Sequence, residues 1–440
     1  MNVLGWRILD KGDYFVGFPA LGREEKELVA AAEERFKEAT RTREAKGREE
    51  SEGLIEEMVI SAAGERGIFL GKEQQDYVCM AAVSQIYGFA FLEELLSNPE
   101  IEEISVIGPE KPVFAYFRRK GWNAVNACFD DEKAIEGMIN RLSRPLGRHI
   151  TMQNPRIDAT LPDGSRLHAS LPPVSGGEIT IRKFRDRPFS PKELAMNGTV
   201  RMEELALLSL LMQCDLSVIV AGNTASGKTT TMNALFTFVP ADERVIIAEE
   251  TPEINVPHEH QLRLLANREM GIELRDLVYD SLRMRPDRMV VGEIRNQKEA
   301  EALFDVLLAG QARGSYATMH AQSAEEALSR LKSFGIPRLD LESIDCIVVQ
   351  RRMLQYDPGK RKNTETRKVV EIAEVDNGVR PVFRKTGETR LLEKIAESFS
   401  LEEREIREEL KKRKRLLASA PDGYAGFYAE IQERLFGGCR

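Results

Sequence analysis

The feature that most constrains the fold of this chain is a glycine-bracketed loop that ends in a lysine and a hydroxyl residue. The loop is Gly222-Asn223-Thr224-Ala225-Ser226-Gly227-Lys228-Thr229, followed by Thr230. It lies between the apolar segment 216–221 and a stretch of helical pattern, the setting in which a GxxxxGK[ST] motif binds phosphates. Glycines let backbone N–H groups close around phosphate oxygens, and a helix N-terminus adds a favourable dipole. The sequence therefore predicts a strand, a phosphate-binding loop and a helix.

Two side chains at the end of this loop suit the chemistry of a nucleoside triphosphate. Lys228 would neutralise charge on the β- and γ-phosphates, and the Thr229 hydroxyl would ligate Mg²⁺. An accidental glycine-rich turn is the alternative, and the complete eight-residue pattern in its strand-loop-helix setting argues against it. We therefore expect residues 222–230 to bind ATP together with Mg²⁺.

Acidic residues follow two apolar segments downstream of the loop. Glu249, Glu250 and Glu253 follow the segment 245–248, and Gly292 and Glu293 follow the segment 289–291. Carboxylates at the carboxyl ends of parallel strands meet the ligand of such a sheet. There they can hold metal-bound water, or orient and deprotonate an attacking water. Either segment alone fits solvated loop acids equally well, but both of them after a phosphate loop favour a catalytic site.

His320 follows a further short apolar segment, 314–319. A lone histidine is more often structural than functional, although its titration range suits a side chain that senses a phosphate. Its place at the end of a predicted strand, like that of the acidic residues, favours the functional interpretation.

Short apolar segments alternate with helical patterns through the second half of the chain. A helical pattern over 202–213 leads into the segment 216–221, and 245–248, 289–291 and 316–319 follow. This alternation predicts an α/β domain with a parallel-rich sheet covered on both faces. A hairpin is expected beyond it, from 348–355 and 368–375, joined through Asp357-Pro358-Gly359.

The first half of the chain has a mixed pattern, with a helical period over 82–96 and short strands at 104–107 and 113–117, which predicts an α+β domain. Two prolines and three charges within 185–191 mark a linker. The expected organisation is an N-terminal helical arm (1–50), an α+β domain (51–184), a linker (185–199), a P-loop domain (200–385) and a helical tail (386–440). In the arm, Leu28, Ala32 and Phe36 share one helical face, which fits either a solvated amphipathic helix or a partner-docking arm.

Composition and charge exclude several other classes of protein. The 440 residues are 42% apolar and 30% charged, the balance of a globular chain of two or three domains. A net charge of -8 gives no general attraction for nucleic acid or anionic lipid. Five scattered cysteines form no CxxC pair, so neither zinc nor a disulfide framework is indicated. The sequence lacks a secretory signal and a spanning apolar segment, so we expect a cytoplasmic protein that reaches a membrane by docking.

These segments, in this order, resemble the type II/type IV secretion ATPase superfamily of secretion motors, type IV pilus assembly and retraction ATPases, and archaellum motors. The resemblance covers Tyr87 to about Val375. Segment 246–253 resembles the family's Asp box, 290–293 its Walker B motif, and 314–320 its His box. The run 281–288 before Walker B is equally typical. Segments 99–106 and 157–166 resemble its N-terminal domain, and 179–184 is similar to the archaeal members in particular.

The resemblance implies a RecA-like P-loop ATPase domain in a homo-hexameric ring. Glu293 would act as the general base or hold the Mg²⁺-bound water, and Glu249 and Glu253 would support that water and the metal shell. His320 would report the γ-phosphate.

In this family, arginines of the first domain reach the ATP phosphates. Arg166 and Arg182 are the matching positions, and the alternative for either is a surface ion pair. Two departures from the family pattern stand out. Glu250 occupies the place of the usual Asp of the box. The four-cysteine insertion of bacterial type II ATPases is absent, which predicts no zinc and fits an archaeal-type, pilus-type or conjugation-type member.

The expected function is a Mg-ATP-hydrolysing motor that powers protein secretion, or the assembly or retraction of type IV pilus-like or archaellum filaments. Its expected partner is a polytopic membrane platform protein, and its expected location is the inner face of the cytoplasmic membrane. A nucleic-acid-translocating motor is the rival enzyme, and the basic residues Arg351, Arg352 and 360–362 are the only sign of it. A non-catalytic nucleotide-dependent scaffold is the other rival, and the intact Lys228, Thr229 and Glu293 argue against it.

Overall fold

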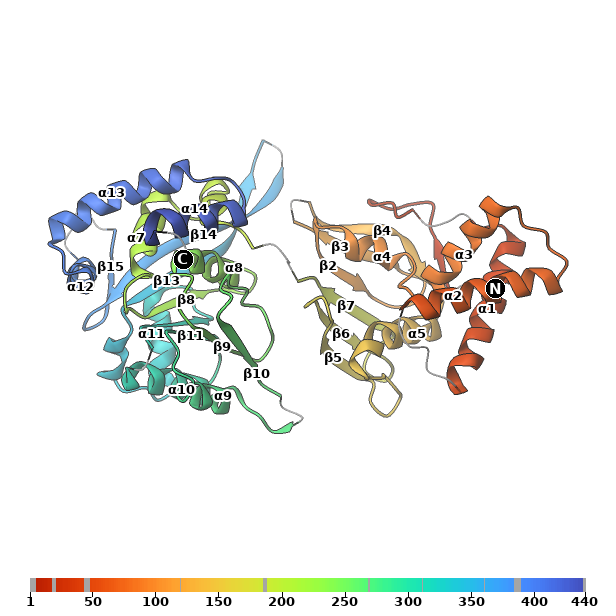
Figure 1. The fold of residues 1–440 in the computed structure, drawn as a ribbon, viewed down its shortest axis with the longest axis horizontal. Coiled ribbons are helices and arrows are strands. Elements are labelled where there is room, and N and C mark those ends of the chain that lie inside the picture. The colour runs from red at the N-terminus through yellow and green to blue at the C-terminus, as the bar shows by residue number, and fades with distance from the viewer. Residues whose placement is uncertain are drawn as a thin grey trace. The chain divides into compact units, whose positions relative to one another are not determined.

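The computed structural model of the chain describes residues 5–17, 21–42, 48–118, 120–184, 188–267, 270–310, 312–359, 361–383 and 389–437. The chain divides into two compact units, Met1–Arg185 (unit 1) and Asp186–Arg440 (unit 2). Figure 1 shows both units along the colour ramp from red to blue. Residues 185–187 of the expected linker, Lys360 of the basic segment and the cysteine at 439 lie outside the described residues.

Unit 1 combines helices with an antiparallel sheet, as expected for an α+β domain. Its helices are α1 (Arg23–Thr42), α2 (Arg48–Glu65), α3 (Lys72–Ile86), α4 (Leu92–Ser97) and α5 (Glu132–Ser143). Its strands are β1 (Trp6–Ile8), β2 (Ile101–Val106), β3 (Pro112–Phe117), β4 (Gly121–Phe129), β5 (Arg156–Thr160), β6 (Arg166–Ser170) and β7 (Glu178–Arg182). The strands lie in the order β1-β4-β3-β2-β7-β6-β5, and every neighbouring pair is antiparallel.

The N-terminal helices are part of the core of unit 1. Leu28, Val29 and Ala32 of α1 are fully buried, and Phe36 is 5% exposed. Val29, Ala32 and Phe36 belong to the same hydrophobic cluster as residues of α2, α3 and the sheet. The apolar face read from the sequence therefore packs against the chain's own helices.

The helical period expected over 82–96 is interrupted in the structure. α3 ends at Ile86 and α4 begins at Leu92, and between them Ala90 has φ 50°. A Cβ on Gly88 would lie 2.9 Å from the Ser84 carbonyl oxygen and 2.3 Å from Glu93 Oε1. Ser84 Oγ also donates to Glu93 Oε2 (2.8 Å) across the break. The apolar spacing continues through the break because both helices face the same core, which is why periodicity alone predicted a single helix.

Unit 2 is an α/β domain, as the alternating pattern predicted. Its helices are α6 (Pro191–Met196), α7 (Met202–Leu211), α8 (Lys228–Leu235), α9 (Leu274–Ser281), α10 (Gln297–Ala309), α11 (Ala324–Ser333), α12 (Arg390–Phe399), α13 (Glu403–Ser419) and α14 (Tyr424–Phe436). Its strands are β8 (Val218–Gly222), β9 (Val245–Glu249), β10 (Gln261–Leu265), β11 (Arg288–Ile294), β12 (Gly314–Met319), β13 (Cys346–Asp357), β14 (Lys362–Val375) and β15 (Val379–Pro381).

The sheet of unit 2 has the order β10-β9-β11-β12-β8-β13-β14-β15. The neighbours from β10 to β13 are parallel, and β14 and β15 are antiparallel additions. Its two faces bury separate cores. Val218 and Val220 of β8 face one core, which includes residues of α7, α12, α13 and α14, whereas Ile219 and Ala221 face the other, which includes residues of α9, α10 and α11. The segment expected as a tail, 386–440, thus contributes to the core of unit 2.

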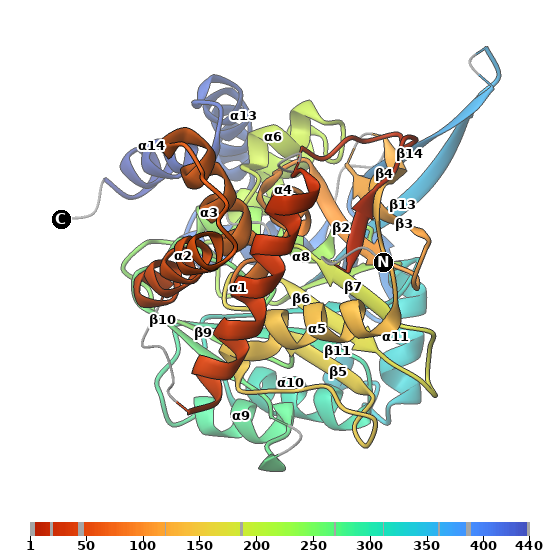
Figure 2. The same cartoon turned by 90° about the vertical axis from the view of Figure 1, so that its right-hand side faces the viewer.

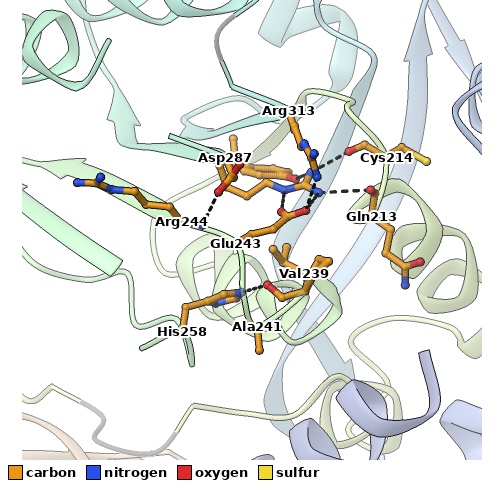
Figure 3. Close-up of polar contacts among 12 residues, drawn as sticks. Gln213, Cys214, Val239, Ala241, Glu243, Arg244, His258, Asp287 and Arg313 are labelled. Carbon is orange, nitrogen blue, oxygen red and sulfur yellow. Dashed lines mark hydrogen bonds and ion pairs between the residues drawn. The ribbon is translucent and has the colours of Figure 1, made fainter. Parts of the chain in front are cut away.

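A buried ion pair ties together the starts of two strands of this sheet (Figure 3). The fully buried Arg288, the first residue of β11, pairs with Glu243, which precedes β9. Its Nη1 also donates to the Cys214 carbonyl oxygen (2.8 Å) and to the Tyr316 hydroxyl (3.0 Å). Charge-assisted bonds to several partners are what make a buried guanidinium tolerable. This network lies at the amino ends of the strands.

Candidate active site

The loop 222–229 connects β8 to α8, and its path requires glycine at two positions. Gly227 has φ 94°, a conformation that glycine adopts without steric cost. A Cβ on Gly227 would lie 3.0 Å from Gln350 Nε2, and one on Gly222 would lie 2.1 Å from the Gln350 carbonyl oxygen. Ala225 also has a positive φ, 58°. The loop is therefore folded closely around itself and against β13, with α8 beginning at Lys228.

The side chain of Lys228 lies against the loop and near Glu293 of β11. Its side chain is largely buried, with Nζ 3.3 Å from the Gly222 carbonyl oxygen. The same Nζ lies 3.9 Å from Glu293 Oε1. The expected phosphate-binding lysine and the expected catalytic acid are thus neighbours.

Glu293 lies among basic side chains near the end of β11. His320, directly after β12, has Nε2 2.9 Å from Glu293 Oε1. Arg295 Nε donates to Glu293 Oε2 (2.6 Å), and Arg295 Nη1 donates to Glu250 Oε2 (2.6 Å). Arg295 therefore links Glu250, directly after β9, to Glu293, near the end of β11. The Glu at position 250, which departs from the family pattern, has Arg295 as a partner.

The imidazole of His320 is shifted toward its neutral form. Burial, and after it the positive charge of Lys228, lower the pKa of His320, and the Glu293 carboxylate opposes them. A neutral imidazole so close to a carboxylate donates its Nε2 hydrogen. Thr318 Oγ1 on the same strand donates to the Gly292 carbonyl oxygen (2.7 Å), which fixes β12 against the Gly-Glu segment of β11.

Thr229 and Glu253 bring two oxygen donors together at the start of α8. Thr229 Oγ1 lies 3.1 Å from Glu253 Oε2. Asn233, one turn further along α8, donates to the Glu253 carbonyl oxygen (3.2 Å) and accepts from the Asn255 backbone N–H (2.9 Å). These bonds hold the segment after β9 against the helix that carries Thr229.

Glu249 faces inward, toward the backbone of its own segment. Its side chain is 2% exposed, and its Oε1 accepts from the backbone N–H groups of Glu253 (3.0 Å) and Ile254 (2.9 Å). Arg263 Nε on β10 lies 3.5 Å from Oε2. Burial raises the pKa of Glu249 to about 7, against the lowering effect of these hydrogen bonds and of Arg263. A Cβ at Gly292 would lie 2.8 Å from Glu249 Cγ, so a glycine before Glu293 gives this side chain its space.

The donor set fits a magnesium ion that is shared with a nucleotide. Mg²⁺ prefers oxygen ligands and is usually held by one or two protein groups together with substrate phosphates and water. Among the described residues, no group of three or more histidines, cysteines and acids is arranged to hold a metal ion by itself. The oxygens of Thr229 and Glu253, which lie together at the start of α8, can provide the one or two protein ligands that a nucleotide-bound Mg²⁺ needs. Glu293, the other predicted ligand, is engaged with His320 and Arg295.

Four residues of this site were not predicted from the sequence. Arg295, Arg263, Asn233 and Gln350 each bond or pack against a predicted site residue. Arg295 alone had a local signal, because it lies two positions after Glu293 and next to the strand end. Arg263 and Gln350 belong to β10 and β13, and only the sheet order brings them to the loop and the acids.

Arg166 and Arg182 lie in unit 1, where they form one pair across the antiparallel strands β6 and β7. Both are exposed. Like charges directly opposite each other on a sheet repel, so this pair forms a local concentration of positive charge. Their contact with a nucleotide stays a prediction.

A known protein family matches most of the chain. Residues 86–414 match the family described as Type II/IV secretion system protein. The chain belongs to this family, the superfamily of type II and type IV secretion ATPases.

Individual relatives come from archaea and bacteria. An uncharacterized protein of Methanocaldococcus jannaschii, MJ0900, is 31% identical over 82% of this chain and 71% of its own length. The type IV secretion system protein VirB11 of Bartonella quintana is 27% identical over 56% of this chain and 85% of its own length. The X-ray structure of the Legionella pneumophila ATPase DotB is 16% identical, covers 80% of this chain and 92% of its own, and has a TM-score of 0.48. Among the residues that the structure describes, no helix is both long and apolar enough to cross a bilayer.

Proposed function

We propose that the chain is a RecA-like P-loop ATPase that hydrolyses Mg-ATP and converts hydrolysis into domain movement. The observation that carries this proposal is the convergence of Lys228, Glu293 and His320. Glu293 Oε1 lies 3.9 Å from Lys228 Nζ and 2.9 Å from His320 Nε2. Lys228 lies after β8, Glu293 near the end of β11 and His320 directly after β12. These three strands are neighbours in the sheet, and their carboxyl ends form the edge where ligands of α/β sheets bind.

Each side chain has a role that follows from its position. Lys228 leaves its contact with the Gly222 carbonyl oxygen and neutralises phosphate charge, while the backbone of residues 222–230 surrounds the phosphates. Glu293 orients the attacking water and accepts its proton. His320 holds the Glu293 carboxylate and responds to the γ-phosphate beside it. When bound, Mg²⁺ neutralises phosphate charge, and Thr229, with Glu253 and Glu293, would hold it or its water.

Glu249 supports this site through the backbone. Because its carboxyl binds the N–H groups of Glu253 and Ile254, it sets the path of the segment that carries Glu253 to Thr229. Its replacement would therefore affect the metal side of the site without removing a ligand.

The chain would act as a homo-hexamer at the inner face of the cytoplasmic membrane, bound to a polytopic platform protein. Family membership supports this placement, as does the description of the VirB11 relative as a type IV secretion system protein. Its cargo would be a secreted protein, or the subunits of a type IV pilus-like or archaellum filament. Stimulation of ATP hydrolysis by the cytoplasmic loops of the platform is the expected outcome. Loops that neither bind nor stimulate would refute this placement.

Two substitutions test the chemistry. Lys228→Ala should abolish ATP binding or turnover, because the phosphate loop loses the lysine that neutralises phosphate charge. Glu293→Gln should keep ATP binding and lose hydrolysis, because it removes only the group that accepts the proton. Phosphate release reports turnover, and a fluorescent ATP analogue reports binding. Wild-type turnover in the Glu293→Gln protein would exclude the role given to Glu293.

A further inference from the structure

The β13–β14 hairpin leaves the sheet of unit 2 beside the phosphate loop. β13 pairs with β8 only from Cys346 to Gln350, whereas it pairs with β14 as far as Asp357. The segment 351–357 extends roughly 23 Å at about 3.3 Å per residue. We call residues 351–357 and their partners on β14 the outer hairpin. Figure 2 shows the outer hairpin, in blue, reaching away from the rest of unit 2.

A β-bulge lies where the outer hairpin begins. Val349 pairs with Glu371 and Gln350 pairs with Val369, so Val370 is the extra residue of β14. A bulge bends its strand, increases the local twist and changes the direction of the residues beyond it. It coincides with the end of the pairing between β13 and β8. The bulge at Val370 of β14 therefore sets the direction in which the outer hairpin leaves the sheet.

The root of the hairpin is bonded to the phosphate loop and to the helix α8 that follows it. Thr231 Oγ1 donates to Gln350 Oε1 (2.6 Å). The Arg352 backbone N–H donates to Asn223 Oδ1 (2.9 Å), and Asn223 Nδ2 donates to the Arg352 carbonyl oxygen (3.3 Å). Gln350 is 1% exposed and also packs against Gly227. These contacts would pass a change of the loop on nucleotide binding directly to the hairpin.

The outer hairpin exposes two large apolar side chains on one face. Leu354 is 68% exposed and Tyr356 is 61% exposed, and residues two apart on a strand share a face. Beside them, Glu365 pairs with Arg352 (3.1 Å) and with Arg367 (3.4 Å). These ion pairs reduce the positive charge next to the apolar residues. Such a face suits a protein surface better than a run of phosphates.

The charge of the hairpin indicates which protein surface it fits. The segment 351–368 contains seven basic and two acidic residues, a formal charge of +5, whereas the whole chain carries -8. The remainder of the chain therefore carries -13, so a second copy is opposite in net charge to the hairpin, which favours their association. The turn between the strands, 358–361, has no large apolar side chain to insert into a bilayer. These features favour a second copy of the chain over a membrane.

We propose that the outer hairpin docks on a second copy of this chain, and that its bonds to the phosphate loop make the docking depend on the bound nucleotide. The proposal rests on the ATPase function proposed above and names a surface through which its subunits would communicate.

The direct test is the double substitution Leu354→Ser, Tyr356→Ser in the full chain. Leu339→Ser, at a side chain 79% exposed elsewhere in unit 2, is the matched control. Sedimentation velocity with and without ATP, in the presence of Mg²⁺, measures assembly. Wild type and control should assemble with nucleotide, and the double variant should self-associate at least about tenfold more weakly, the effect of losing one strong contact residue. ATP binding by the double variant, measured with a fluorescent analogue, should match that of the control.

Two further variants keep the test decisive if the double variant folds poorly. Lys368→Glu retains the apolar face and reverses an exposed charge, and it should weaken assembly most at low salt, where charges are least screened. Asn223→Ala removes the side-chain bonds to Arg352 and should make assembly less dependent on nucleotide.

Assembly of the double variant equal to wild type would overturn the proposal, and so would a wild-type chain that stays monomeric with nucleotide. Loss of binding to single-stranded DNA or to phosphatidylserine vesicles, with assembly unchanged, would assign the outer hairpin to those ligands instead. Because assembly is read from mass, it is independent of catalysis. A wild-type chain that assembles without hydrolysing ATP would refute the proposed function and leave the docking intact.

Discussion

His320 Nε2 lies 2.9 Å from Glu293 Oε1, so the residue after β12 holds the carboxylate near the end of β11. Because burial and Lys228 lower the pKa of His320, the ring is neutral at pH 7 and donates to the carboxylate. His320→Ala should reduce kcat roughly 10- to 100-fold, the usual effect of removing a group that orients a reacting one, with little change in ATP affinity. His320→Gln keeps a donor and should recover part of the loss. Equal activity of the two variants would contradict an orienting hydrogen bond.

The stability of the protein should depend on pH through Glu249. Its ordinary pKa of 4.5 rises to about 7 in the folded chain because the side chain is buried. A carboxyl with a raised folded pKa contributes stability that is complete below the unfolded value and is lost as the pH rises through the folded value. Between pH 5 and pH 8, wild type should therefore lose stability relative to Glu249→Gln, by roughly 1–3 kcal/mol.

Thermal unfolding of both proteins across this pH range checks the prediction for Glu249. If the difference in stability between the two proteins does not change with pH, the Glu249 carboxyl of the folded protein is already ionised throughout this pH range. Glu430→Gln, which alters an acid with a side chain 27% exposed, paired with Arg434 on α14, should show no such trend.

Breaking the ion pair between Arg288 and Glu243 should lower the stability of unit 2 more than most single substitutions do. Glu243→Gln leaves the guanidinium, which is 0% exposed, without its counter-charge, and should cost roughly 3–5 kcal/mol. Replacing both residues, as Arg288→Met with Glu243→Leu, should cost less than the single substitution, because no buried charge remains. Urea unfolding followed by circular dichroism measures both. A single variant as stable as wild type would show that water reaches the arginine.

Arg166 and Arg182, paired across β6 and β7, should supply positive charge to the phosphates when the two units close, within one chain or between copies. Replacing each with Ala should reduce turnover severely, since an arginine of this kind contributes roughly a thousandfold or more in P-loop enzymes. ATP affinity should change much less.

Mixing experiments separate the two routes for these arginines. The double variant Arg166→Ala, Arg182→Ala is inactive by this prediction, and so is Lys228→Ala. Mixed assemblies should regain part of the activity if the arginines act on a neighbouring copy. No recovery, despite demonstrated exchange of subunits, would indicate action within one chain. Full activity of the double arginine variant would remove both residues from the mechanism.

The sequence by itself determined the elements whose chemistry is local. The phosphate loop was predictable because its glycines, lysine and threonine are consecutive between an apolar strand and a helix. The parallel direction of β8, β9, β11 and β12 was also predictable, since each is an apolar run that alternates with helices, whereas their order in the sheet was not. The hairpin was expected from the turn after Gln355, and the structure extends it to β13 and β14.

Only the tertiary structure decided which side chains around the loop contact one another. Glu249 and Glu253 are close in sequence, yet Glu249 turns inward to its own backbone while Glu253 reaches Thr229. Arg295 joins Glu250 to Glu293 because β9 and β11 are neighbours in the sheet. Arg288 is buried because Glu243, 45 residues earlier, lies opposite it. Contacts of this kind depend on sheet order and burial, which bring distant residues together and leave no periodic signal in the chain.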